Sequence, residues 1–339
     1  MDILPVIEAC IRNLESAGYR SFDLFDGLSS PFARPLRSGP RIVARIWQQI
    51  FLRLPVNLRR ALGVRKTVSS KTLADVLKAS ALLRLSGVEV QTGLESLSEK
   101  ILARAHRGWS GKCWGTDLPY ASRVVQDGGG TPNLVTTCFC ADALLSAYLV
   151  TRDARLLEAA KSACAFIADD LGELRLAEGV CFRYFPGVDE AIHNANMLGA
   201  ALCARVGKLT AVQNLIDRAL AATDYTVACQ RADGSWYYGE KAQYHWIDNF
   251  HTGYVLDSLL TILRVAPKDD HRAARREGSA ILLTGFSAMA CLPNSRPTAD
   301  IPLTSRGSHK PSRPCASSLI GTDAAVHLPR ERSLGLWKT

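Results

Sequence analysis

The sequence predicts an all-α fold, an incomplete α/α toroid of helical hairpins, because one unit occurs three times. Each copy is an aromatic-rich glycine turn, a polar loop and a helix of small and apolar residues, with turns beginning at Gly111, Gly179 and Gly234. The helices follow at Leu134–Leu145, Asn194–Ala204 and Asn249–Leu260. The matching positions Thr137, Ala195 and Thr252 are 58 and 57 residues apart. A period of this length, with a second helix inside each unit, is typical of stacked helical hairpins.

The region before the repeats also has helical periodicity. We expect a helix over residues 1–18, then a polar-aromatic stretch, then a helix over Arg41–Leu54 that Pro55 ends. Ile42, Ile46, Ile50 and Leu54 share one face of this second helix. Helices over Thr72–Leu85 and Leu94–Ala105 follow.

The second helices of the units are expected at Ala154–Leu171 and Leu209–Thr223, and another apolar element starts at Thr226–Gln230. The chain then supplies five hairpins at most, whereas a closed ring takes six. The toroid domain is therefore expected to cover residues 1–278. Residues 279–339 lose the helical period, are rich in Ser, Arg, Pro and Gly in part, and are expected to be a disordered tail.

Composition and charge exclude some classes of function. The chain has 339 residues, of which 47% are apolar, so it can bury one or two cores. Its net charge is +9, and the last 61 residues contribute +4 of this through seven Lys and Arg against three acidic residues. No basic run is interleaved with a nucleic-acid-binding module, so nucleic acid is not an expected partner.

The cysteines and the N-terminus favour a soluble cytoplasmic protein. Several of the ten cysteines, such as Cys140, Cys164 and Cys203, occupy buried-looking helical positions, and we expect no signal peptide at the N-terminus. Reduced thiols are therefore expected. No apolar run approaches the ~20 residues that span a bilayer.

Two resemblances come from short motifs. The segment from Gln230 to Trp236 (QRADGSW) resembles the repeat motif of prenyltransferase and squalene-cyclase toroids, in which the Gln and Trp tie neighbouring hairpins together. Residues 18–260 are more similar to α/α-toroid proteins of bacterial exopolysaccharide gene clusters. This similarity is carried by Tyr19 with Asp23–Ser30, Cys113–Gly115, Gly130–Asn133, Asn194–Asn196 and Trp246–Gly253. It implies a toroid that acts on an oligo- or polysaccharide during polysaccharide biosynthesis or modification, and it requires no cofactor.

Such proteins would be expected to continue past residue 278 with another helix and a Tyr-Pro-Ile-Asp segment, which this chain lacks. If the codons for Asp300 to Ser305 are read out of register, they can encode Tyr, Pro, Ile, Asp and Val at that place. We therefore expect a frameshift near Gly278 that removes part of the last hairpin.

Asp248 and His251 are the leading catalytic candidates. They are three residues apart at a helix start, so both can face the funnel of the toroid. Asp248 would then be a general acid or base for a sugar hydroxyl, and His251 would assist it. Alternatively, Asp248 caps the helix and His251 packs in the interior. The two interpretations are compatible.

Further candidates lie in the loops. Asp23 and Asp26 flank aromatic rings, and Asp117 lies near Trp114; such carboxylates bind sugar hydroxyls or move protons, although an Asx-turn explains Asp23 and Asp26 equally simply. The expected stacking walls are Trp114, Trp236, Tyr238 and Trp246. The amides and imidazole of His193, Asn194 and Asn196 would suit hydroxyl recognition, unless Asn194 only caps its helix.

A zinc site is not expected. Cys113, Cys138, Cys140 and His193 raise the question, because lanthionine cyclases are also toroids and share a Cys-Trp/Tyr-Gly-like element. However, the chain has no Cys-His dipeptide, and Cys138 and Cys140 point to different sides of a helix. Buried apolar thiols are the expected role.

A basic region accompanies the second helix and contains Arg41, Arg45, Arg53, Arg59, Arg60, Arg65 and Lys66. It is either the solvated face of an outer helix or a contact with an anionic membrane. The expected function is binding or modification of a carbohydrate chain during exopolysaccharide synthesis. The alternatives are a terpenoid cyclase or prenyltransferase-like enzyme, whose Asp-rich diphosphate cluster the sequence lacks, and a non-catalytic scaffold. The sequence indicates no oligomeric state.

Overall fold

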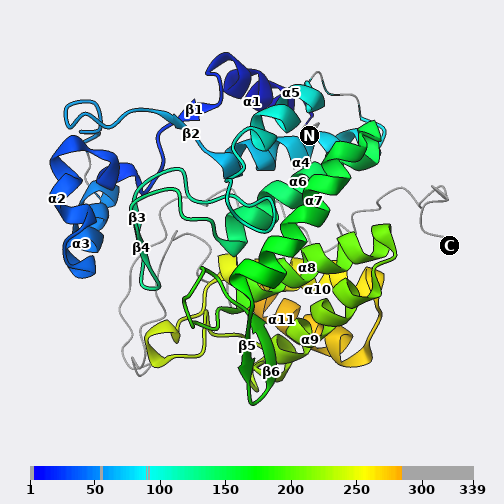
Figure 1. Cartoon of the computed structure of the whole chain (residues 1–339). Coiled ribbons are helices and arrows are strands. Elements are labelled where there is room, and N and C mark those ends of the chain that lie inside the picture. The colour runs from blue at the N-terminus through cyan, green and yellow to red at the C-terminus, as the bar shows by residue number, and fades with distance from the viewer. Residues whose placement is uncertain (1–3, 54–55, 89, 91, 285–339) are drawn as a thin grey trace, which may run out of the picture. The chain divides into compact units, whose positions relative to one another are not determined.

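The computed structural model describes residues 4–53, 56–88, 90 and 92–284, which belong to one compact unit of helical hairpins (Figure 1). The inner helices are α4 (Ser70–Leu85), α6 (Leu134–Thr151), α8 (His193–Thr210) and α10 (Asn249–Val265). The outer helices are α5 (Leu94–Leu102), α7 (Ala154–Ala165), α9 (Gln213–Ala228) and α11 (Asp269–Thr284). Because α6 packs against α4 and α8, and α8 against α10, the inner helices form one continuous wall. The predicted all-α toroid fold is confirmed.

Local signals explain where the repeat helices begin and end. Asn133 caps α6 by accepting from Thr136 N at 2.9 Å. The expected break after Thr223 is wrong, because α9 runs on to Ala228. The Thr223 hydroxyl donates to the carbonyl of Ala219 one turn earlier, at 2.7 Å, so this buried threonine is satisfied inside the helix.

Each repeat glycine lies against the outer helix of the hairpin that follows it. A Cβ atom on Gly111 would lie 1.9 Å from the Ser162 carbonyl oxygen of α7, and one on Gly234 would lie 3.0 Å from the Glu277 carbonyl oxygen of α11. Only a residue without a side chain allows this approach. The repeat turns are therefore packing points between successive hairpins.

The tryptophans after these turns bind the hairpin that precedes them. Trp114 Nε1 donates to the carbonyl of Ile101 in α5 at 2.8 Å, and Trp236 Nε1 donates to that of Thr226 in α9 at 2.8 Å. Gln230 Nε2 donates to the carbonyl of Ala274 in α11 at 2.9 Å. These bonds are the ties between hairpins that the Gln-Trp resemblance implies.

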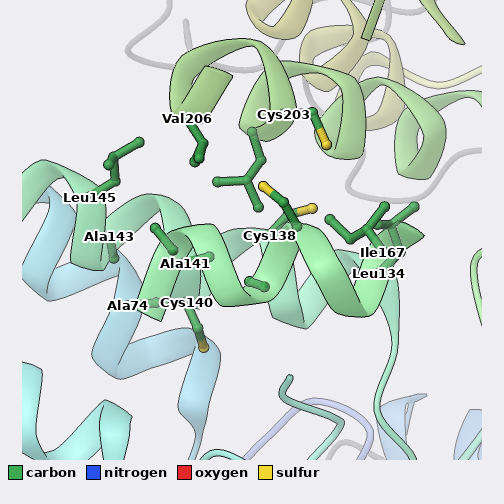
Figure 2. Packing of buried hydrophobic residues seen from close by; sticks show 14 of the residues in the cluster. Ala74, Leu134, Cys138, Cys140, Ala141, Ala143, Leu145, Ile167, Cys203 and Val206 are labelled. Carbon is green, nitrogen blue, oxygen red and sulfur yellow. The ribbon is translucent and has the colours of Figure 1, made fainter. Parts of the chain in front are cut away.

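Helix α6 lies at the centre of the main core (Figure 2). Cys138 faces α8 near Cys203, whereas Cys140 faces α4, where its thiol lies 3.7 Å from the Ser70 carbonyl. Burial raises the pKa of both thiols well above the usual value, and the eight cysteines in the described ranges are free. By length and composition α6 is apolar enough to span a membrane, contrary to expectation, but 61% of it is buried in this core.

The N-terminal segment forms a small second core. It contains α1 (Leu4–Ser16), the antiparallel pair β1 (Arg20–Ser21) and β2 (Thr67–Val68), the 3₁₀ turns Asp26–Ser29 and Pro31–Ala33, α2 (Arg34–Arg37) and α3 (Arg41–Arg53). Leu28, Ala33, Ala44 and Ala121 pack together there.

The orientation of α3 is opposite to the one its apolar stripe suggests. Ala44, Gln48 and Phe51 are buried, while Ile42, Ile46 and Ile50 are 58%, 52% and 49% exposed. Gln48 faces inward because its amide donates to the Phe25 carbonyl at 3.0 Å and accepts from Ala121 N at 3.0 Å. The isoleucine stripe therefore faces solvent.

Two β-hairpins shape the loops above the helices. β3 (Tyr120–Ala121) pairs with β4 (Gln126–Asp127), and β5 (Glu173–Leu176) pairs with β6 (Gly179–Phe182), both antiparallel. At the other end of the unit, α11 continues past Gly278 to Thr284. The segment over residues 300–305, and the rest of the predicted tail from residue 285, lie outside the described residues.

Candidate functional site

A narrow aromatic pocket, with about 230 Å³ of empty space when the solvent at its open mouth is included, lies where the third repeat loop enters α10. Tyr238 and Trp246 stack with ring centroids 4.4 Å apart and planes 14° apart, and Tyr238 N donates to the Trp246 carbonyl at 2.8 Å. The His251 ring meets Tyr238 edge-on at 4.6 Å. Seven of the predicted site residues line this pocket, namely His193, Asn194, Trp236, Tyr238, Trp246, Asp248 and His251.

Asp248 and His251 form a hydrogen-bonded pair at the start of α10. Asp248 Oδ1 accepts from His251 N at 2.8 Å, so the carboxylate caps the helix. Asp248 Oδ2 lies 2.6 Å from His251 Nδ1 and 3.2 Å from Trp246 Nε1. Both alternatives considered for this carboxylate are thus found together, since it caps α10 and also lines the pocket.

The charge of Asp248 defines the tautomer of His251. Burial alone would raise the pKa of Asp248, but the hydrogen bonds and charge of His251, with the Trp246 indole, lower it below the usual value. An ionised carboxylate only accepts hydrogen bonds, so His251 Nδ1 carries the proton in this pair. Within the described ranges His251 Nε2 has no hydrogen-bond partner, and this atom is left for a ligand.

The second repeat contributes residues with different roles. His193 is 1% exposed, and its Nε2 lies 2.6 Å from Glu240 Oε1. Asn194 is 6% exposed, and its side-chain oxygen has no partner among the described residues. Asn196 is not a binding residue: it is fully buried, donates to the Ala222 carbonyl at 2.7 Å and accepts from Phe182 N at 2.9 Å.

One group in the described part of the chain could hold a metal ion. The ligand atoms of His193, Cys229 and Glu240 lie within 4.8 Å of one another. Burial raises the pKa of Cys229 to about 11, so its thiol is protonated here and a metal ion would have to displace that proton on binding. The hydrogen bond from His193 to Glu240 already satisfies both side chains, and the cluster fits a structural role.

A second pocket lies under the N-terminal loop and the first repeat loop, with an empty volume of about 640 Å³ counted to its open mouth. It brings together Asp23, Phe25, Lys71, Asp117 and Tyr120. Here the Asx-turn expected as the alternative is present, because Asp23 Oδ1 accepts from Phe25 N at 2.8 Å. Asp23 is nevertheless exposed at the pocket.

Asp117 and Asp26 are occupied by structural bonds. Asp117 accepts from Ser70 N at 2.6 Å, which caps α4, and pairs with Arg104 at 2.8 Å. Asp26 is 1% exposed and accepts twice from Arg59 Nε at 2.9 Å. Asp26 therefore does not reach either pocket as a catalytic group.

Two of the four expected stacking walls are core residues. Trp114 is fully buried, and Trp236 is 2% exposed although it borders the first pocket. Their indole groups tie hairpins together, so neither ring is free to stack on a ligand. Tyr238 and Trp246 remain, and one face of each of these rings is covered by the other.

Sequence reasoning missed Arg123, whose guanidinium lies 4.4 Å from the Trp246 ring centroid. It also gave no role to Tyr184. Burial raises the pKa of the Tyr238 hydroxyl, and electrostatic interaction with Tyr184 and Tyr120 raises it further.

No family model matches the chain, and no curated protein matches it in sequence. Among solved structures it is similar to a family 76 α-mannanase of Bacteroides thetaiotaomicron, with 18% identity and a TM-score of 0.50 over 67% of this chain and 62% of that one. It is also similar to the unsaturated glucuronyl hydrolase of Bacillus sp. GL1, with 14% identity and a TM-score of 0.46 over 83% and 82%. The cellobiose 2-epimerase of Spirochaeta thermophila has 10% identity and a TM-score of 0.48 over 63% and 57%. The chain spans between about half and three fifths of the family 76 structures that it matches, and the likeness to the mannanase shows the fold.

Proposed function

We propose that this protein binds and modifies a carbohydrate chain during bacterial exopolysaccharide biosynthesis. The observation that carries the proposal is the stacked pair Tyr238 and Trp246 beside the Asp248–His251 pair in one open pocket. Aromatic faces stack on the apolar faces of sugars, and the polar pair supplies proton transfer. The mannanase of the same fold acts on a polysaccharide, which supports the class of substrate.

We infer separate roles for the two members of the pair. His251 Nε2 is the atom that takes a proton from, or returns one to, the bound sugar. Asp248 is a positioning residue, because both of its oxygens are engaged in capping α10 and in holding His251 Nδ1. The carboxylate also stabilises the imidazolium that forms when His251 takes the proton.

Asp23 extends the same proposal to the second pocket. It is exposed beside Phe25 and Tyr120, whose rings meet edge-on at 6.4 Å. A carboxylate beside aromatic rings suits a further sugar unit of the chain. Asp117 lines this pocket too, but its bonds to Ser70 and Arg104 leave it a supporting role.

The test is proton transfer in heavy water. Mannan oligosaccharides, cellobiose and D-mannose would be incubated with the full chain in D₂O and followed by ¹H NMR for deuterium uptake, isomerisation and cleavage. We expect turnover of a saccharide that His251→Ala lowers by roughly 10²–10⁴-fold. His245→Ala is the matched control, because this exposed histidine stacks on Tyr237 and does not line the pocket.

Other outcomes would contradict the proposal. If the His251→Ala variant turned over the saccharide as fast as the wild type, the imidazole would have no part in the reaction. Turnover of a magnesium–diphosphate ester, and of no saccharide, would favour the terpenoid or prenyltransferase class. The absence of all binding and turnover would favour a non-catalytic scaffold.

We also propose that the reading frame changes near Gly278, so that the tail differs from that of an intact relative. The support is the out-of-register Tyr-Pro-Ile-Asp segment over residues 300–305. Resequencing the gene across the codons for Arg275 to Arg306 tests this proposal. A confirmed sequence would contradict it, whereas an inserted or missing base would require activity tests on the repaired chain.

A further inference from the structure

The outward face of α3 is an unusual surface for a helix in a water-soluble domain. Ile42, Ile46 and Ile50 form a stripe opposite the buried face, and Val43 beside them is 41% exposed. Nine of the sixteen large apolar side chains that are exposed in the described ranges lie between residues 20 and 68. Contiguous exposed apolar area of this kind marks an interaction site.

The same segment carries a net charge almost as large as that of the whole chain. Residues 20–68 contain ten Lys and Arg against two Asp, a net charge of +8, while the whole chain has +9. Asp26 is neutralised by Arg59, so Asp23 is the remaining acidic group there. The exposed cations of this segment include Arg41 and Arg53 at the two ends of α3, and Arg34, Arg60, Arg65 and Lys66 elsewhere in it. We call the isoleucine stripe with these cations the α3 surface.

The charge of the α3 surface limits what can cover it. A second copy of the chain would place one segment of net charge +8 against another of the same charge, and the two would repel each other. Residues 285–339 carry seven Lys and Arg against three acidic residues, so this segment is also positive. An acidic glycan would match the charge, but glycans stack on aromatic rings, and the stripe offers branched aliphatic side chains instead. The partner must combine negative charge with an apolar layer.

We propose that the α3 surface docks the protein on an anionic lipid bilayer. A helix with an apolar face and flanking cations lies in the plane of the interface, with its apolar side chains in the acyl boundary and its cations at the headgroups. If the polysaccharide is assembled on a membrane, docking through the α3 surface would keep the proposed saccharide pocket close to its substrate. The docking itself does not depend on the proposed activity.

Vesicle co-sedimentation tests the proposal with the full chain. Wild-type protein is expected to sediment with phosphatidylcholine vesicles that contain phosphatidylglycerol, and to remain in solution with pure phosphatidylcholine. The triple variant Ile42→Ser, Ile46→Ser, Ile50→Ser is expected to lose at least about tenfold in partitioning, because three apolar side chains no longer enter the acyl boundary. Raising the salt concentration is expected to weaken wild-type binding.

The control replaces exposed apolar residues outside the α3 surface, with Leu82→Ser, Leu176→Ser and Leu209→Ser in one protein. It should bind vesicles as the wild type does. Circular dichroism and the melting temperature of both triple variants show whether they fold. Equal binding by the isoleucine variant, or no wild-type binding to anionic vesicles, would overturn the proposal. So would a wild-type dimer that the isoleucine variant converts to a monomer without any vesicle binding, since the stripe would then be an interface between copies.

Discussion

The close contact of Gly111 with α7 gives a direct test of how the hairpins stack. In Gly111→Ala the new methyl carbon would lie 1.9 Å from the Ser162 carbonyl oxygen and 2.7 Å from Phe166 N. Both atoms belong to backbone, so neither can rotate away, and α7 must move from the first repeat turn. Overpacking of this severity costs about 3 kcal/mol. A domain of this size then melts roughly 6–12 °C lower.

Gly253→Ala is the matched control. Gly253 lies inside α10, its φ is not in the left-handed region, and a Cβ there would meet nothing within 4 Å. Alanine should therefore raise the free energy of unfolding by about 0.5–1 kcal/mol. Urea denaturation of both variants gives the comparison. If Gly111→Ala were within about 0.5 kcal/mol of wild type, a value typical of neutral surface substitutions, the stacking account would be refuted.

Substitutions at three further contacts can be tested by urea or acid denaturation. Arg59→Met should cost about 3–5 kcal/mol by leaving the buried Asp26 carboxylate unpaired, whereas Asp26→Asn should cost clearly less; equal costs would contradict the ion-pair reading. Gln230→Ala should lower the free energy of unfolding by about 1–3 kcal/mol, because the hydrogen bond to the Ala274 carbonyl is lost. An unchanged free energy of unfolding would contradict the role of Gln230 as a tie between hairpins. The lowered pKa of Asp248 stabilises the fold above its unfolded pKa of about 3.9, and this contribution is lost as pH falls through the lower folded pKa. Asp248→Asn should therefore flatten the acid limb of the stability curve, and an unchanged limb would contradict the pairing with His251.

The repeat was the part of the fold that could be predicted best from sequence. Glycine and aromatic residues recur near the start of each copy, and Asn133 and Asp248 cap the helices of the first and third copies. The spacing of Asp248 and His251 was also informative, since a helix start brings residues three apart together. The ties made by Gln230 and Trp236 were expected only through the resemblance to other toroids.

The remaining errors concern which neighbour a side chain meets. Periodicity showed that Ile42, Ile46 and Ile50 share a face, but it could not show that the polar Gln48 would be the residue with buried partners. The aromatic context of Trp114 looked like a binding wall, although its indole is used between hairpins. Asp26 was likewise indistinguishable from Asp23 until Arg59, 33 residues away, was placed beside it.

The central claim is that the pocket of Tyr238, Trp246 and His251 receives a saccharide. Saturation-transfer NMR with manno-, cello- and glucuronate-containing oligosaccharides measures this directly on the full chain. We predict transfer to at least one of them, and we expect Trp246→Ala to weaken its binding roughly tenfold by removing about 1.5 kcal/mol of stacking. Phe250→Ala, at a residue that is 61% exposed and outside the pocket lining, should bind as wild type does. Transfer to no saccharide, or equal transfer with Trp246→Ala, would contradict the account.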